Sequence, residues 1–365
     1  MAAWGGRGKW VAVIAAVLGF VGLASAQSLP TSAPLPTIPE VTPPPIAGPG
    51  SLGWPQPVYP PGTPLLETSP SVIAGPQQTM SGAPLPGSLE DELAQEYDAR
   101  RKFRYCVWDG TTVTAFPRNL LWQPPFAAKR EPRMLLNPTT LNNYLDPWTL
   151  DTSIGTTVGM WRMDLPGHDL SFQFDIAAVV HTRLTPDDLL AADYRFGFPL
   201  SARWGPWHAK VAYEHTSAHI GDEFIRAQRP AIIPGVSRDE FVFGVGRWMW
   251  DQLRVYGQVS YGARLAYFTG FTEQFRWRFD YGFEWFNPAP TGWAGTPFAA
   301  LNLDHRGDQN FDANLNVQVG WLWRNPYERL ANVRLFAEYY TGGSPYGVFF
   351  QTKETFVAVG LSCDY

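Results

Sequence analysis

The stretch QFRWRFDYGFEW, residues 274–285, decides the fold class. Its odd-numbered positions are all aromatic: Phe275, Trp277, Phe279, Tyr281, Phe283 and Trp285. Its even-numbered positions are polar or glycine: Gln274, Arg276, Arg278, Asp280, Gly282 and Glu284. Successive side chains of a strand point to opposite faces, so period two places every aromatic on one face. Six alternations in a row predict a long amphipathic β-strand.

The same alternation recurs in residues 170–180, 192–204, 253–268 and 311–324. These segments are longer than the roughly 5 to 6 residues of a usual soluble strand. Tryptophan pairs lie at segment ends, at 204 and 207, 248 and 250, and 321 and 323. Aromatic girdles at two membrane interfaces explain this placement, whereas the dry core of a β-sandwich would not. The pattern therefore predicts an all-β protein, a closed antiparallel transmembrane β-barrel.

A strand count gives the expected topology. We expect twelve strands, at Glu131–Thr139, Thr152–Met163, Leu170–Leu184, Leu189–Trp204, Trp207–Phe224, Arg238–Trp250, Gln252–Phe268, Phe271–Asn287, Pro297–Asp304, Gln309–Asn325, Ala331–Gly343 and Glu354–Tyr365. An even number places both ends of the barrel chain on the periplasmic side, where turns are short. Ten strands is the alternative, because the first strand and the one at Pro297 carry the weakest pattern.

The chain has 365 residues, of which 17% are charged and 15% aromatic, and it contains 16 Trp. Its one long apolar run, residues 11–24, follows Arg7 and Lys9 and precedes the small-residue site Ala24-Ser25-Ala26, as in a signal peptide. A Pro- and Gly-rich stretch follows, which favours a disordered linker. We expect four parts: a signal peptide at 1–26, a periplasmic linker at 27–87, a short helix at 88–105 and a barrel domain at 106–365.

Partners and cofactors follow from the same features. The last strand alternates and ends in Tyr365, which resembles the signal read by the barrel-assembly machinery of the bacterial outer membrane. We therefore expect that location, with outer-membrane lipids as partners. The net charge of −5 disfavours nucleic acid. No phosphate-binding or metal-binding motif occurs, so we expect no cofactor and no metal. Cys106 and Cys363 either pair or remain free thiols.

The polar faces of the strands project charges into the barrel. The residues expected inside are Asp175, Asp193, Arg195, Arg203, Lys210, Glu214, Arg254, Arg264, Arg276, Arg278, Asp280, Glu284, Asp312, Arg334 and Glu338. Their signs are mixed, and unpaired charges in a narrow space are costly. We expect a paired network that plugs the lumen, with a small pore as the alternative.

The strand Trp207–Phe224 interrupts its own apolar face. That face reads Trp207, Ala209, Val211 and Tyr213 and then continues as His215, Ser217 and His219. Positions two apart on one face lie roughly 6.6 Å apart, so either histidine can hydrogen-bond the serine. A serine with a neighbouring base, facing lipid, is what a hydrolase of membrane lipids requires. The two histidines are roughly 13 Å apart, too far to share one metal ion.

Two resemblances bear on this stretch. Tyr213-x-His215-x-Ser217 resembles the His-x-Ser strand of outer-membrane phospholipase A and of the lipid A deacylase, barrels with an outward-facing catalytic serine. In those families a third residue comes from the neighbouring strand. Here that strand offers Asp239 and Glu240, and Glu223 follows on the same strand, while the Ser-Asn-Gly continuation of the families is absent. The candidate catalytic set is Ser217, His215, His219, Glu223 and Glu240.

A wider resemblance covers most of the chain after residue 131. The segments EPRM, DYRFGFPLSARWGPWHAKVAYEHTSAHIGDEF, NPAPTGWAGTPFAALN and NVQVGWLW resemble an uncharacterised bacterial envelope β-barrel family, a domain of unknown function. The resemblance implies a barrel and no activity.

Three functions remain open at this point. The first is a structural or lipid-contact role, with His215 and His219 as polar residues at headgroup level. The second is a membrane-lipid acyl-ester hydrolase, and the third is a narrow channel or transporter. The remaining histidines, His168, His181, His208 and His305, lie near expected turns and are interpreted as solvent-facing.

Overall fold

The computed structural model describes residues 104–108, 110–117, 119–141, 148–228, 235–324 and 332–364. The expected signal peptide and linker lie outside these ranges, and so does the expected helix as far as residue 103. Residues 104 and 105 begin strand β1. Within the described ranges, no helix is long and apolar enough to cross a membrane.

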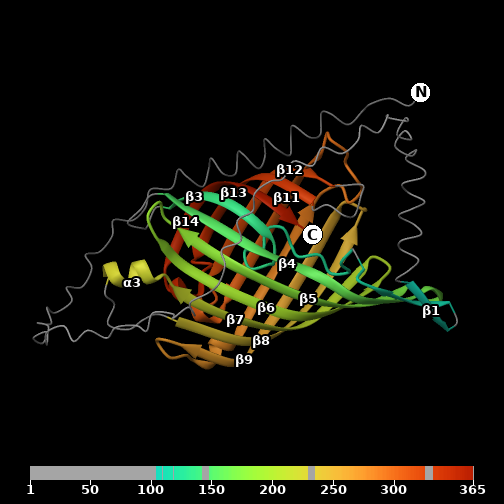
Figure 1. The fold of residues 1–365 in the computed structure, drawn as a ribbon, viewed down its shortest axis with the longest axis horizontal. Coiled ribbons are helices and arrows are strands. Elements are labelled where there is room, and N and C mark those ends of the chain that lie inside the picture. Colours follow the sequence, from blue (N-terminus) through green and yellow to red (C-terminus); the bar gives the residue numbers. More distant parts are fainter. Residues whose placement is uncertain are drawn as a thin grey trace, which may run out of the picture. The chain divides into compact units, whose positions relative to one another are not determined.

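Twelve strands form a closed antiparallel barrel, which confirms the expected fold class (Figure 1). They are β3 (Met134–Leu141), β4 (Trp148–Leu165), β5 (Leu170–Leu184), β6 (Leu189–Trp204), β7 (Trp207–Ile220), β8 (Gly235–Met249), β9 (Leu253–Tyr267), β10 (Trp277–Trp285), β11 (Thr296–Arg306), β12 (Ala313–Trp323), β13 (Asn332–Gly343) and β14 (Lys353–Asp364). Each pairs with the next, and β3 pairs with β14, which closes the sheet. The hairpin of β1 (Arg104–Trp108) and β2 (Thr111–Ala115) pairs with the end of β4.

Short helical turns connect some strands. They are η1 (Pro166–His168), α3 (Asp222–Gln228), η2 (Glu273–Arg276), η3 (Gly307–Gln309) and η4 (Gly347–Phe349). The first barrel strand begins and the last one ends at the same side of the wall, which we call the terminal end. α3 and η4 lie at the opposite side, the far end. Tight turns join strands at the terminal end, for example at Gly205, whose φ of 53° suits glycine.

The apolar face of each strand points outward. On β10, Trp277, Phe279, Tyr281 and Phe283 are each exposed by 42–44%, whereas the alternate residues are buried. At the terminal end, the rings of Trp204 and Trp207 stack with centroids 6.4 Å apart. An outward band of this kind, flanked by aromatic residues, is the lipid-facing surface of a transmembrane barrel.

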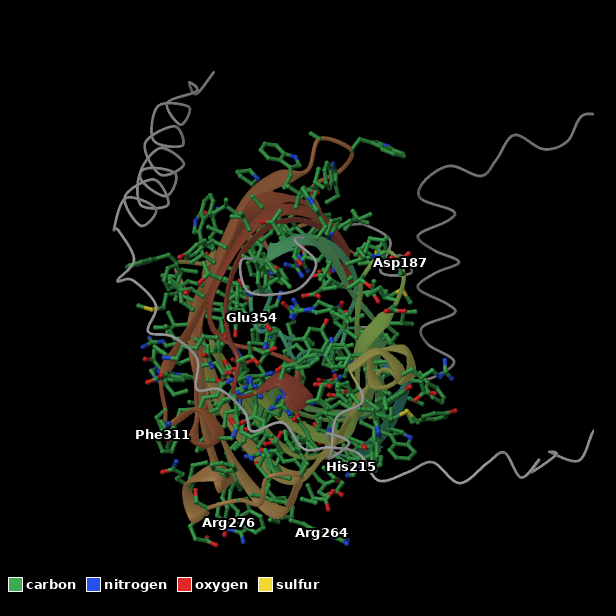
Figure 2. All side chains as sticks on the ribbon, turned by 90° about the vertical axis from the view of Figure 1, so that its left-hand side faces the viewer. Asp187, His215, Arg264, Arg276, Phe311 and Glu354 are labelled. Carbon is green, nitrogen blue, oxygen red and sulfur yellow. The ribbon has the colours of Figure 1, made fainter. Side chains whose placement is uncertain are left out.

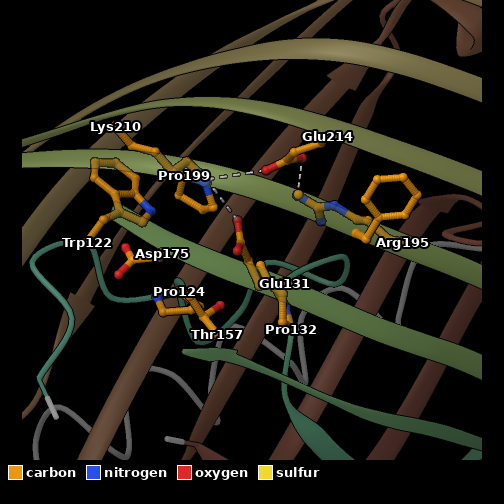
Figure 3. A pocket seen from close by; sticks show the side chains of 13 residues that line it. Trp122, Pro124, Glu131, Pro132, Thr157, Asp175, Arg195, Pro199, Lys210 and Glu214 are labelled. Atoms are coloured by element: carbon orange, nitrogen blue, oxygen red, sulfur yellow. Dashed lines mark hydrogen bonds and ion pairs between the residues drawn. The ribbon is translucent and has the colours of Figure 1, made fainter. Parts of the chain in front are cut away.

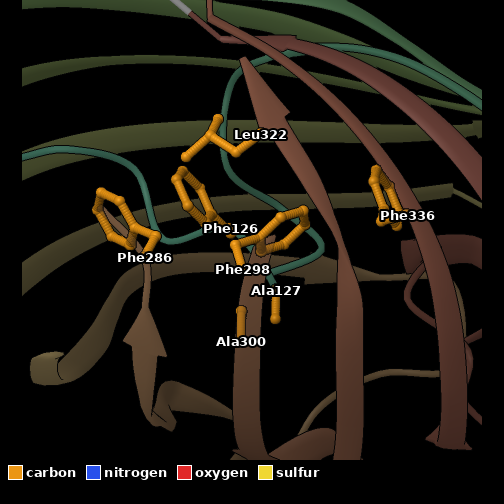
Figure 4. Packing of buried hydrophobic residues seen from close by; sticks show 7 residues of the cluster. All are labelled: Phe126, Ala127, Phe286, Phe298, Ala300, Leu322 and Phe336. Carbon is orange, nitrogen blue, oxygen red and sulfur yellow. The ribbon is translucent and has the colours of Figure 1, made fainter. Parts of the chain in front are cut away.

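The described residues of a segment between β2 and β3, residues 116–133, fill the lumen from Leu120 onward. Phe126 packs on Phe286 and Phe298, with ring centroids 4.9 and 5.6 Å away (Figure 4). The Arg334 guanidinium lies 4.2 Å from the Phe126 ring centroid. Trp122 lies against Gly244, where any side chain would collide with the indole. The barrel interior is therefore a packed core of aromatic rings from both the wall and the segment.

Charged residues of the same segment pair with the wall. Lys129 lies 2.9 Å from Glu338, and Arg130 lies 3.2 Å from Glu240. The Lys210 ammonium lies 3.9 Å from the Glu131 carboxylate (Figure 3). Burying an unpaired charge is costly, so each ion pair holds the segment in the lumen only while both of its partners are present.

The loop at residues 344–352 closes the far end. Tyr346, Val348 and Phe350 are buried against inward residues of β6, β7 and β8, such as Ala218. The Arg183 guanidinium lies 4.5 Å from the Tyr346 ring centroid. Within the described part of the barrel, four interior cavities have volumes of about 20, 30, 30 and 10 Å³. A water molecule needs roughly 10–15 Å³, so each of these cavities has room for about one to three waters.

The lumen expectations are partly confirmed. Ion pairs join most of the charges that were expected inside, as in Arg195 with Glu214 and Arg254 with Glu284. The expectation was wrong for Arg203, Arg264 and Asp312, which are exposed, and for Arg276, which is half-buried and pairs with the exposed Glu273. Arg276 and Asp312 lie at loops of the far end, where the strict alternation of the strands has ended.

Strand boundaries also differ by a few residues at several places, and two of these differences have a clear cause. The first barrel strand begins at Met134, not at Glu131, because Glu131 and Arg133 belong to the lumen segment. The Arg133 guanidinium donates to the backbone carbonyls of Pro125 and Ala128 at 2.6 and 3.0 Å, which holds the segment in a compact turn. Strand β10 begins at Trp277, because η2 occupies the preceding residues.

Removal of the Arg183 charge is expected to destabilise the barrel. Arg183 is fully buried, and its guanidinium lies 2.7 Å from Asp151 and 2.8 Å from Glu354. Arg183→Met leaves two carboxylates in the interior without this cation, at a cost of about 3–5 kcal/mol in the free energy of unfolding. Urea unfolding of the refolded protein in detergent, followed by tryptophan fluorescence, measures it. The control Arg203→Met, at an exposed position, should change that free energy by less than about 0.5 kcal/mol.

The filled lumen predicts no steady ion conductance. In planar bilayers the full chain should stay closed, and so should a variant that lacks residues 345–351, because segment 116–133 still fills the interior. A chain that combines this deletion with a Gly/Ser replacement of residues 119–130 should conduct. Steady current through the unmodified chain would contradict the packed interior.

Candidate functional site

Ser217 lies on the outward face of β7, with a histidine on each side of it. Its Oγ lies 2.8 Å from Nε2 of His219, within hydrogen-bond distance. His219 is exposed, while His215 and Ser217 are half-buried among neighbouring side chains. The strand pattern places these side chains outside because Thr216 and Ala218, the alternate residues, face the lumen and are buried.

The second histidine is held by an acid from β8. His215 and Asp239 are directly opposite each other in the β7–β8 ladder, and His215 Nδ1 lies 2.5 Å from Asp239 Oδ1. The same carboxylate oxygen accepts a hydrogen bond of 3.0 Å from the Tyr213 hydroxyl. Two contacts thus fix the Asp239 carboxylate, and one of them orients the His215 ring with Nε2 directed away from the acid.

Aromatic rings border the two histidines. The Phe196 ring centroid lies 5.0 Å from that of His215, and the Tyr194 centroid lies 5.8 Å from that of His219. Both rings come from β6, and Phe241 of β8 borders Tyr213 at 6.0 Å. The polar group is therefore set in an apolar wall that can contact acyl chains.

The structure separates the acidic candidates. Asp239 is on the same face as Ser217, but Glu240 is buried in the lumen, where it pairs with Arg238 at 2.6 Å and with Arg130. Glu240 thus lies on the other side of the wall from the serine. Glu223 belongs to α3, beyond the end of β7, and its side chain is outside the described residues.

The remaining histidines and cysteines lie elsewhere. His208 is only 2% exposed and packs under Trp122, and His181 faces the lumen and contacts the Arg130 carbonyl at 3.3 Å. The expectation that both face solvent was wrong, because the lumen segment covers them.

Cys106 and Cys363 are free thiols. Among the described residues, no three His, Cys, Asp or Glu side chains gather as ligands for a metal ion.

The outward apolar wall and the closed twelve-strand sheet define the chain as a transmembrane β-barrel. Residues 113–365 match the model of the family described as protein of unknown function (DUF1207), and the chain belongs to that family. This agrees with the wider resemblance of the sequence. The search of curated proteins gave no match.

Several solved outer-membrane barrels are similar in fold. Outer membrane phospholipase A from Escherichia coli is 12% identical, with a TM-score of 0.42 over 67% of this chain and 93% of that one. The KdgM porin is 7% identical, with a TM-score of 0.34 over 64% and 99%. The translocator domain of the autotransporter NalP from Neisseria meningitidis is 12% identical, with a TM-score of 0.34 over 76% and 96%.

The exposure of the histidines predicts their chemical reactivity. Diethyl pyrocarbonate should modify His168 and His219 in the folded protein in detergent, whereas His181 and His208 should be protected until the chain is unfolded. Mass spectrometry of the digested protein locates the modified rings. Modification of His208 as fast as that of His219 would contradict the packing of the lumen segment over His208.

Proposed function

We propose that this barrel lies in the bacterial outer membrane and hydrolyses acyl esters of membrane lipids at its lipid-facing wall. The observation that carries the proposal is the 2.8 Å contact between the Ser217 hydroxyl and the imidazole of His219 on the outward face. A nucleophile within hydrogen-bond distance of a base is the arrangement that activates a serine. The barrel-assembly machinery would insert the chain through its last strand.

The proposed chemistry begins at the hydroxyl. Ser217 Oγ attacks the ester carbonyl carbon, while its proton passes to Nε2 of His219. The C–O bond to the alcohol then breaks, and the alcohol leaves with that proton. Water hydrolyses the acyl-serine in a second step in which His219 again accepts and returns a proton. The fatty acid and the deacylated lipid both remain next to the wall.

His215 and Asp239 form a second pair of interacting side chains in the site. Asp239 orients the His215 ring from the opposite strand, as a third residue does in a catalytic triad. The two histidines flank Ser217 at the same spacing, so a rotation of the serine side chain exchanges its partner. The contact present favours His219 as the base, and His215 is then placed to stabilise charge on the reacting ester.

The filled lumen disfavours the channel. Segment 116–133 and the loop at 344–352 occupy the interior, and the four cavities described between their side chains and the wall have room for only about one to three waters each. Transport through the barrel would require both the segment and the loop to move. A purely structural or lipid-contact role remains the outcome if no turnover is found.

Loss of the serine is expected to abolish turnover. Ser217→Ala should lower the rate of acyl-ester hydrolysis by at least about 10³-fold, because no attacking oxygen remains. Release of fatty acid from mixed micelles of phospholipid, and separately of lipopolysaccharide, measures it. Ser237→Ala is the matched control, because Ser237 lies directly opposite Ser217 on β8 and no histidine contact accompanies it in the described structure.

The same assay assigns the base. His219→Ala should lose roughly as much activity as Ser217→Ala, and His215→Ala less, because the hydroxyl contacts His219. The reverse order would transfer the role of base to His215 with Asp239. Equal turnover by the unmodified chain, Ser217→Ala and Ser237→Ala would remove the hydrolase and leave a lipid-contact role.

A further inference from the structure

A β-bulge lies directly beside the candidate site. In the β8–β9 ladder, Asp239 pairs with Arg264 and Glu240 pairs with Gly262, so Ala263 is an extra residue. A bulge changes the direction of the side chains that follow it. Ala263 and Arg264 are both exposed, whereas Gly262 and Leu265 are buried. The bulge therefore brings Arg264 to the outer face, although strict alternation from Tyr261 would point it into the lumen.

Arg264 interacts with the Asp239 carboxylate only through space, without a direct bond. Its guanidinium makes no hydrogen bond or ion pair in the described part of the chain, although Asp239 faces it across the ladder. Asp239 already accepts from Tyr213 and His215. Figure 2 shows Arg264 at the outer edge of the ring of strands, on the same side as His215. Five N–H donors are thus available on the outer face, two strands away from the serine.

The depth of Arg264 in the wall identifies its environment. β9 ends three residues later, at Tyr267, so Arg264 lies roughly 10 Å from the far end of the strand. An arginine on the lipid face costs about 2–4 kcal/mol at the bilayer midplane and close to nothing near the interface. The position suits headgroup level, where lipid phosphates occur and where a guanidinium binds phosphate with two parallel hydrogen bonds.

We propose that Arg264 binds the phosphate of the lipid whose acyl ester reaches Ser217. Two strand spacings and two residues separate these positions, which places their Cα atoms about 12 Å apart. The two side chains extend over the same outer surface, with Asp239 and His215 between them. A phosphate-bearing acyl lipid spans this interval, with its headgroup at β9 and its ester at β7. The proposal rests on the proposed function and adds the substrate class.

A binding experiment tests the phosphate site without catalysis. Native mass spectrometry of the Ser217→Ala protein measures retention of phosphatidylglycerol, of lipid A and of phosphate-free diacylglycerol. Adding Arg264→Gln should weaken retention of at least one phosphate-bearing lipid tenfold or more and leave diacylglycerol unchanged. Arg264→Lys should retain part of the effect. Arg203→Gln, which removes an exposed arginine at the terminal end of the wall, is the matched control and should change nothing.

The two phosphate-bearing lipids distinguish the sources of phosphate. A loss confined to lipid A or to phosphatidylglycerol supports the site and identifies its ligand. An equal change for all three lipids, or the same loss from Arg203→Gln, overturns the proposal. These readouts do not depend on turnover, so they stand even if Ser217 proves inert.

Kinetics add a second readout in an active protein. Arg264→Gln should raise KM for the phosphate-bearing substrate tenfold or more with little change in kcat, and should leave hydrolysis of a phosphate-free ester unchanged. If hydrolysis of both esters falls equally, Arg264 acts through Asp239, and the phosphate site is excluded.

Discussion

The pairing of β3 with β14 is the constraint on which the rest of the structure depends. Hydrocarbon offers no partner for a backbone N–H or C=O group, so a sheet in a membrane can have no open edge. Six pairs of residues join these two strands, and β3 is the shortest strand of the barrel. Closure at twelve strands fixes the interior diameter, and side chains of the wall alone do not fill it. An interior segment is the consequence of that diameter.

The interior segment complements the wall both in apolar packing and in charge. Phe126 supplies apolar surface where the wall presents Phe286 and Phe298, and Lys129 and Arg130 supply cations where the wall presents buried glutamates. Without the segment, those glutamates would lose these cations and face a water-filled lumen. The segment and the wall therefore act as one core, although strand periodicity governs only the wall.

This division explains what the sequence could predict. Period two is a property of strands, so it located the twelve strands and placed Ser217 and both histidines outside. Residues 116–133 have no period, so the lumen segment was missed, and with it the burial of His208. A bulge adds one residue to a ladder without a signal in the composition, which is why Arg264 was placed inside. The choice between Asp239 and Glu240 follows from the same period, because Asp239 shares the odd-numbered face of β8 with the outward Phe241 and Phe243. What needs the β7–β8 pairing is the position of Asp239 directly opposite His215.

The interior segment also connects to the outward site. Thr216 lies between His215 and Ser217 on β7 but faces inward, and its hydroxyl accepts a hydrogen bond of 3.1 Å from Arg130 of the segment. Arg130 in turn pairs with Glu240, the neighbour of Asp239 on β8. One guanidinium thus joins, from inside, the two strands that carry the serine, the histidines and the acid on the outside. A site set on rigid strands needs such support to keep its geometry. Here the support comes from the lumen segment, which contacts the inner side of the same two strands.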